Sequence, residues 1–81
     1  MTSDYFRHYK TNGIYQIITQ NAKDSNTLEP LVVYLNIHTK EIWVRKKEEF
    51  FEYVSTDSLE LVKRFTPVDP REHIQLYYGD F

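Results

Sequence analysis

The chain lacks cysteine altogether and has only two glycines, three prolines and one tryptophan among its 81 residues. Without cysteine there is no disulfide framework, no thiolate metal ligand and no cysteine nucleophile. No window approaches the roughly 18 consecutive apolar residues of a membrane-spanning helix, and the first ten residues carry charges instead of the apolar run of a signal peptide. We therefore expect a soluble, cytoplasmic protein that does not contact the membrane.

An excess of charge of either sign is also lacking, since ten Lys and Arg residues stand against twelve Asp and Glu residues. No overall positive field attracts nucleic acid, so binding to it would depend on a local basic patch. Aromatic side chains, by contrast, are abundant: seven Tyr, five Phe and one Trp. Aromatic rings bury large apolar areas, which is how so short a chain can form a stable core.

Alternation of apolar and polar side chains predicts a mainly β protein with antiparallel strands. Asn12 and Gly13 supply a turn between the first two strands, and the polar run 36–41 is too short for a helix. The segment 47–54 fits either a short helix or one helical turn leading into a strand, and we favour the second. The strands expected from the pattern are 5–10, 14–19, 31–36, 42–46 and 59–65, with a loop at 21–30.

The end of the chain has a helical pattern of its own. Asp69-Pro70-Arg71-Glu72 combines an N-cap residue, a proline at the first helical position and a carboxylate three residues after the cap. We therefore expect a β-domain over residues 1–68 and a helical or aromatic tail over 69–81 that packs on it, or that meets another chain. One apolar stripe follows the helical period through Ile74, Tyr77, Tyr78 and Phe81.

Several spaced motifs carry a resemblance to a known family. They are Arg7-His8-Tyr9-Lys10, Thr27-Leu28-Glu29-Pro30 with the strand after it, Trp43-Val44-Arg45 and Arg64-Phe65. Over about residues 5–66 the chain resembles the bacterial family called domain of unknown function 1653. The resemblance implies a small SH3-like β-barrel. Together with the patterns above, we expect a mainly β fold: an antiparallel barrel of about five to six strands with a short C-terminal helix, which lies outside the resemblance. It implies no activity, so no catalytic residue is carried over.

The sequence shows no pattern typical of catalysis or of metal binding. The three histidines, His8, His38 and His73, lack the short spacing of metal ligands, so we expect no metal site and no cofactor. The two glycines stand far apart, which excludes a glycine-rich phosphate loop. We expect no catalytic residue and no enzyme; the alternative is a small enzyme or enzyme accessory domain that uses His8.

The predicted function is a non-enzymatic binding module that recognises a peptide or protein partner through an aromatic and basic surface. A single-stranded nucleic-acid-binding module that uses Arg45, Lys46 and Lys47 with aromatic side chains is the alternative. Oligomeric state is open between a monomer and a homodimer formed through an edge strand or the tail. The candidate ligand-binding residues are His8, Tyr9, Lys10, Tyr34, Trp43 and Arg45, and Tyr15 is a further aromatic candidate.

Two of these residues pose a question of orientation. Tyr34 faces outward if Leu31, Val33 and Leu35 face the core. Trp43 or Arg45 could then stack beside it across the strands. The placement of Trp43 that we favour is instead in the barrel interior, with its indole N–H bonded to the backbone and with Ile42 and Val44 outward. Only one face of each strand can lie inside.

Overall fold

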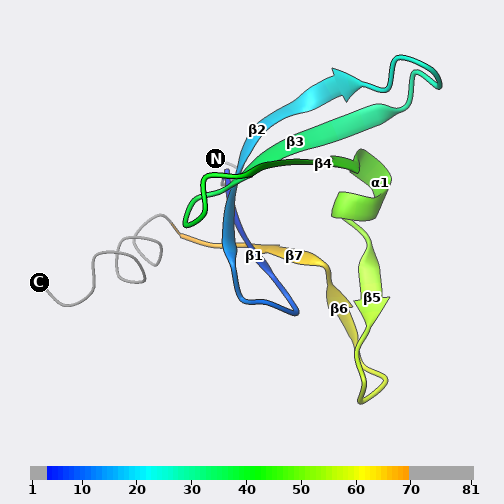
Figure 1. Cartoon of the computed structure of the whole chain (residues 1–81). Coiled ribbons are helices and arrows are strands. Elements are labelled where there is room, and N and C mark those ends of the chain that lie inside the picture. Colours follow the sequence, from blue (N-terminus) through cyan, green and yellow to red (C-terminus); the bar gives the residue numbers. More distant parts are fainter. Residues whose placement is uncertain (1–3, 70–81) are drawn as a thin grey trace, which may run out of the picture.

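The computed structural model describes residues 4–69, and these residues form a mainly β protein, as the sequence predicts. The tail helix predicted within 69–81 lies outside this range except for its first residue. Within residues 4–69, no helix is long and apolar enough to cross a membrane. Seven strands and one helical turn follow each other as β1 (Tyr5–His8), β2 (Ile14–Lys23), β3 (Pro30–Asn36), β4 (Ile42–Lys46), α1 (Lys47–Phe50), β5 (Tyr53–Ser55), β6 (Leu61–Lys63) and β7 (Phe65–Pro67) (Figure 1).

The main sheet is antiparallel, and its five strands lie in the order β4-β3-β2-β1-β7. Its outer strands, β4 and β7, do not pair with each other in the part of the chain that the structure describes, so the sheet is open rather than closed into a barrel. Between α1 and β7 the chain leaves the main sheet: within residues 4–69, β5 and β6 pair only with each other and form a hairpin pointing away from the main sheet (Figure 1).

The prediction of a single strand at 59–65 is wrong. A bend at Arg64 divides it into β6 and β7, which belong to different sheets. The backbone N–H of Arg64 donates to the carbonyl of Glu52 at 3.0 Å, and its carbonyl accepts from Tyr9 at 3.0 Å. Beyond the bend, Phe65 pairs with His8 of β1. Pro67 is tolerated in β7 because this strand is an edge of the sheet.

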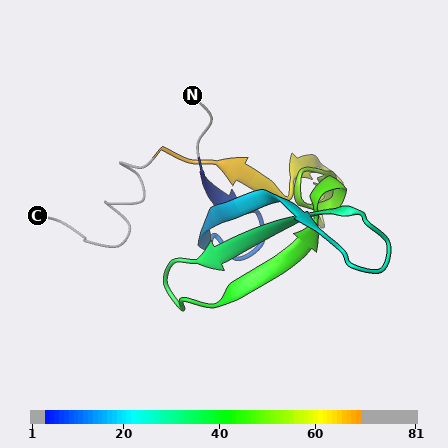
Figure 2. The ribbon, with the colours of Figure 1, turned by 90° about the horizontal axis from the view of Figure 1, so that it is seen from above.

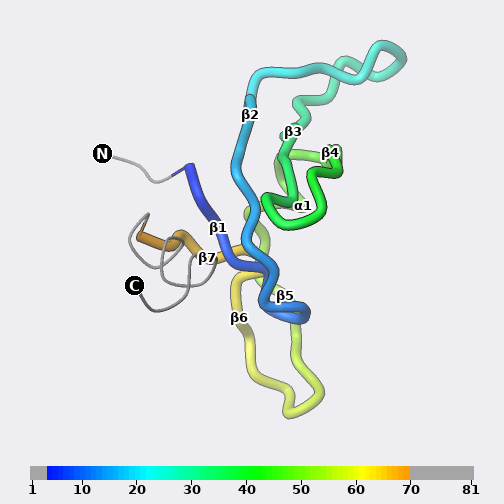
Figure 3. The backbone as a smooth tube through the Cα atoms, turned by 60° about the vertical axis from the view of Figure 1, so that its left-hand side comes forward, coloured from blue at the N-terminus to red at the C-terminus, as the bar shows by residue number. Residues whose placement is uncertain are grey.

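The second strand is longer than predicted and bends along its length. It runs to Lys23, where the sequence indicated a loop from residue 21 on. Its register against β3 shifts between Ile17 and Thr19 and again between Thr19 and Ala22. Such irregularities bend a strand and increase its twist, which makes one face of the sheet concave. Figure 3 follows β2 from the turn after β1 up to the loop that joins it to β3.

The core fills this concave face. The favoured prediction of one helical turn followed by a strand is confirmed by α1 and β5, and the turn places Phe50 over the sheet with none of its surface exposed. The ring of Phe50 stacks on that of Phe65, with centroids 4.0 Å apart and planes 5° apart. Figure 2 shows α1 and β7 on the same side of the curved β2, β3 and β4. The buried cluster consists of Phe6, Ile17, Val32, Tyr34, Phe50 and Phe65.

The other face of the sheet carries a smaller cluster and an exposed apolar surface. Ile14, Ile37 and Val68 are buried together there. Toward the β4 edge, however, Ile42 and Val44 are 63 % and 56 % exposed. These exposed apolar side chains therefore lie on the outer face of the sheet, next to its β4 edge.

Both predicted orientations are wrong. Tyr34 points into the core and is only 5 % exposed, because the core takes the Val32 and Tyr34 side of β3 instead of the side of Val33. Trp43 pairs directly with Tyr34 and so lies on the same face, yet it is 48 % exposed. β4 is an edge strand, so no neighbouring strand covers the outer flank of Trp43.

Candidate functional site

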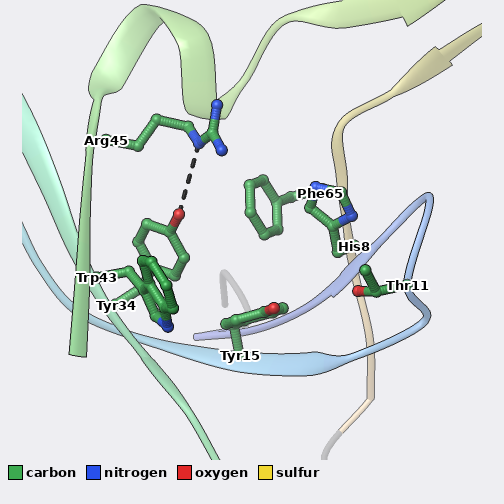
Figure 4. Close-up of a pocket in the computed structure, with 7 residues that line it drawn as sticks. All are labelled: His8, Thr11, Tyr15, Tyr34, Trp43, Arg45 and Phe65. Carbon is green, nitrogen blue, oxygen red and sulfur yellow. Dashed lines mark hydrogen bonds between the residues drawn. The ribbon is translucent and has the colours of Figure 1, made fainter. Parts of the chain in front are cut away.

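A pocket of about 160 Å³ opens on the concave face, where the aromatic core reaches the surface (Figure 4). The β1–β2 turn and five strands contribute to it, because the curved sheet brings together segments that are distant in the sequence. Its lining residues are His8, Thr11, Tyr15, Tyr34, Trp43, Arg45 and Phe65.

Two other hollows on the surface are less suited to a ligand. One, of about 80 Å³, is small and lies between Glu29, Pro30, Lys46 and Glu48. Another, of about 380 Å³, is wide and polar, and it lies along the middle of β2 between Asp4 and Lys47. Binding sites combine apolar walls with a few polar groups, and of these three hollows in residues 4–69 the pocket on the concave face is the one with aromatic walls.

The base of the pocket is a set of three rings in edge-to-face contact. Tyr15 lies 5.4 Å from Tyr34 and 5.6 Å from Phe65, and Tyr34 lies 5.4 Å from Phe65, all measured between ring centroids at interplanar angles of 70–89°. This geometry suits the ring quadrupoles, and each ring restrains the other two. The base is therefore formed before any ligand arrives, which lowers the entropic cost of binding.

Arg45 supplies the formal charge of the pocket. It lies on the inner face of β4, two residues after Trp43, and its Nε donates to the hydroxyl of Tyr34 at 3.5 Å, the long limit of a hydrogen bond. Within residues 4–69, no carboxylate forms an ion pair with Arg45. A guanidinium has five N–H donors, so most of those on this partly buried side chain are free to bind a ligand.

His8 is neutral at physiological pH. Burial lowers the pKa of its imidazole below the ordinary value of 6.5, and the positive charges of Arg45, Arg64 and Lys10 lower this pKa further. The backbone N–H of Lys10 donates to Nδ1 of His8 at 3.2 Å, so Nδ1 is the acceptor and the proton of the neutral ring is on Nε2. His8 therefore contributes an uncharged donor to the pocket wall.

The arrangement is suited to binding rather than to proton transfer. A general base needs a free nitrogen and a group that orients it, whereas Nδ1 of His8 is occupied and the pocket lining contains no Asp or Glu. The hydroxyl of Thr11 accepts from the backbone N–H of Gly13 at 3.2 Å, which closes the turn beside the pocket. No three His, Cys, Asp or Glu side chains of residues 4–69 come close enough together to hold a metal ion.

Four of the six residues predicted from the sequence meet in the pocket: His8, Tyr34, Trp43 and Arg45. The other two lie beside it. The ring of Tyr9 packs on His8 at 5.1 Å but does not line the cavity, and the side chain of Lys10 is exposed.

The pocket also contains residues that were not among the six. Phe65 belongs to the motif Arg64-Phe65, which could have drawn attention to it. Thr11 lies in an ordinary turn and gave no signal. The ring of Tyr15 completes the base.

The basic run after Trp43 does not form one stripe. Successive residues of a strand point to opposite faces, so Arg45 lines the pocket while Lys46 faces the other way. Nζ of Lys46 pairs with the carboxylate of Glu29 at 3.4 Å, and Lys47 begins α1. The three cations therefore point in different directions.

A family model described as "Protein of unknown function (DUF1653)" matches residues 4–67. The chain belongs to this family. The match confirms the resemblance seen in the motifs, and the DUF1653 domain contains the whole pocket, from His8 to Phe65. Comparison of the chain with curated proteins and with solved structures found no match.

Proposed function

We propose that this DUF1653 domain is a non-enzymatic binding module that recognises a protein or peptide partner by receiving one of its residues in the pocket. The observation that carries the proposal is the combination of a preformed aromatic base with one guanidinium that lacks a carboxylate partner within residues 4–69. Aromatic pockets with a few polar groups are a common means of peptide recognition. We also propose that the curved sheet is a variant of the SH3-like fold and that the protein is cytoplasmic.

The size of the pocket supports a side chain as its ligand. Sites for drug-sized molecules and cofactors enclose about 300–1,000 Å³. The pocket has about 160 Å³, which suits a single large residue of a partner. Trp43, half-exposed at the rim, offers apolar area to the backbone on either side of that residue. Such a rim aromatic next to Arg is the composition typical of binding hot spots.

The charge of the pocket argues against a cationic ligand. An aromatic cage for a methylated lysine attracts its cation with ring faces and needs no positive side chain among them. Here the rings meet edge-to-face, so each covers part of a neighbouring ring face, and three cations are near enough to lower the pKa of His8. A neutral or negative group is favoured instead.

Single-stranded nucleic acid is the alternative partner, and the structure supports it less. Binding to a strand requires a continuous basic groove that follows the phosphates, with aromatic side chains between the charges. Arg45 and Trp43 fit this description locally. Lys46, however, is paired with Glu29 on the other face, so only one cation of the run faces the pocket.

The proposal is tested by titrating the ¹⁵N-labelled protein with a peptide library and with a short single-stranded oligonucleotide. Trp43 is the single tryptophan of the chain, so its fluorescence reports on the pocket rim directly. We expect saturable shifts at pocket residues with peptides, lost in Trp43→Ala and retained in the control Lys63→Gln, an exposed residue of β6 outside the pocket lining. Shifts only with the oligonucleotide, abolished by added salt, would contradict the proposal.

A further inference from the structure

The pocket combines two requirements that few residues of a partner meet together. Its base of three rings favours an apolar body, and Arg45 at its side favours a negative group within reach of that body. Figure 4 shows the guanidinium and the hydroxyl of Tyr34 meeting on one side of the pocket, with Phe65 and His8 on the other. A ligand that presents an apolar group and an anion within one residue length therefore matches both features of the pocket.

The hydrogen bond between Arg45 and Tyr34 leaves other N–H and O–H donors of both side chains available to a ligand. The Tyr34 hydroxyl accepts from Nε of Arg45, so its own proton is free to be donated. The terminal nitrogens of Arg45 have no hydrogen-bond partner among residues 4–69, and their fork matches the two oxygens of a carboxylate. Together they form a small donor set that a single carboxylate can satisfy.

Ordinary residues inside a polypeptide do not supply this combination. Phe, Tyr and Leu have the body without the charge, whereas Asp and Glu have the charge on a short polar side chain. A carboxylate and a large apolar side chain occur on one residue where a chain ends, because the last residue keeps its α-carboxylate. Phosphotyrosine also joins a ring to an anion, but its charge is about −1.5 to −2 and its sites usually contain clusters of arginines. The lining here contains one cation, Arg45, which balances one carboxylate. Of the two other cations that act on His8, Arg64 is paired with Glu52 and Lys10 is exposed outside the lining.

We infer that the pocket recognises the C-terminal residue of a partner, with its aromatic or large aliphatic side chain on the Tyr15–Tyr34–Phe65 base and its α-carboxylate on Arg45 and the Tyr34 hydroxyl. This inference rests on the proposed function, and it names the ligand group that the binding module selects. The same chemistry is offered by a free aromatic acid, so the test includes one.

The test compares four ligands by Trp43 fluorescence and amide chemical shifts. They are an acetylated pentapeptide ending in Phe with a free carboxylate, the same peptide as its C-terminal amide, a phosphotyrosine peptide with an amide end, and N-acetylphenylalanine. A charge-assisted hydrogen bond contributes about 1.5–3 kcal/mol, so the free acid should bind about tenfold or more tightly than the amide. Arg45→Gln should remove this ratio, and Arg45→Lys should retain part of it.

The possible results test the inference and the proposed function separately. Equal binding of acid and amide peptides would overturn the inference and leave the binding module standing. Preference for phosphotyrosine would overturn it in favour of a different anion, and binding of no peptide would overturn both. Equal affinity for N-acetylphenylalanine and the acid peptide supports recognition of the last residue alone. Circular dichroism of Arg45→Gln, with Lys63→Gln as the matched control, shows whether a lost ratio comes from a folded protein.

Discussion

Replacing Phe50 by alanine should destabilise the domain far more than replacing its neighbour Phe51. The ring of Phe50 is fully buried, stacks on Phe65 at 4.0 Å and meets Phe6 at 5.4 Å and Tyr34 at 5.2 Å. Removal of such a ring costs about 3–5 kcal/mol, because the lost burial is joined by a cavity. Phe51 is only partly buried, so Phe51→Ala should cost about 1–2 kcal/mol.

These costs are large for a domain of this size. Stability of roughly 0.05–0.15 kcal/mol per residue gives the whole chain about 4–12 kcal/mol. At about 4–8 °C per kcal/mol, Tm should fall by roughly 12–40 °C for Phe50→Ala and by roughly 4–16 °C for Phe51→Ala. Far-UV circular dichroism during heating and urea titration measures both, and Phe50→Leu serves if the alanine variant does not fold. Equal losses at the two positions would refute the helical turn that directs Phe50 into the core.

Three further predictions concern pH, a turn and an ion pair. Burial, together with neighbouring cations, holds the pKa of His8 below 6.5, so the unfolded chain takes up this proton at a higher pH than the folded one. Stability should therefore be full above about pH 6.5 and fall as the pH drops below it, and urea midpoints for His8→Gln should show a weaker fall. Leu59 has φ 64°, a conformation that glycine adopts without steric strain, and its side chain is 85 % exposed. Leu59→Gly should therefore raise the free energy of unfolding by about 0.5–1 kcal/mol. The control Leu61→Gly should lower it, because Leu61 lies in the strand β6. The guanidinium of Arg64 binds the Glu52 carboxylate and a carbonyl of α1. Arg64→Ala should therefore lower the free energy of unfolding by about 1–3 kcal/mol. Added salt screens only the partly exposed ion pair, so it should lower the free energy of unfolding by less than about 1 kcal/mol. A cost of Arg64→Ala no larger than the salt effect would show that the bond to α1 contributes nothing.

The strands and turns could be predicted because local patterns determine them. Alternation located β1 and the cores of β2, β3 and β4, and the polar connection 36–41 indicated their antiparallel pairing. Closure of the sheet could not be predicted, since it depends on where the chain goes after Arg64. That bend is held by Glu52 and Tyr9, two residues distant in the sequence whose backbones bond to Arg64. No local pattern contains this information.

The faces of the strands could not be predicted for a related reason. A period of two says that Val32 and Tyr34 share a side, but β3 is apolar on both sides, so the pattern does not say which side is inside. The choice is made by Phe50 and Phe65, which arrive later in the chain and cover the side of Tyr34. Four of the six residues chosen from the sequence line the pocket, but the predicted orientation was wrong for two of them, because Tyr34 is a core residue and Trp43 is not.

The pocket is a continuation of the core, and this limits how the domain can change its ligand. Tyr34 and Phe65 belong both to the buried cluster and to the pocket wall, so their replacement costs folding as well as binding. Trp43 is half-exposed, and Arg45 is only partly buried without a carboxylate partner in residues 4–69. Changes at these two positions should therefore alter affinity with a small effect on Tm. Specificity within the same fold should accordingly depend on the inner face of β4, an edge strand that contributes two pocket residues outside the buried cluster.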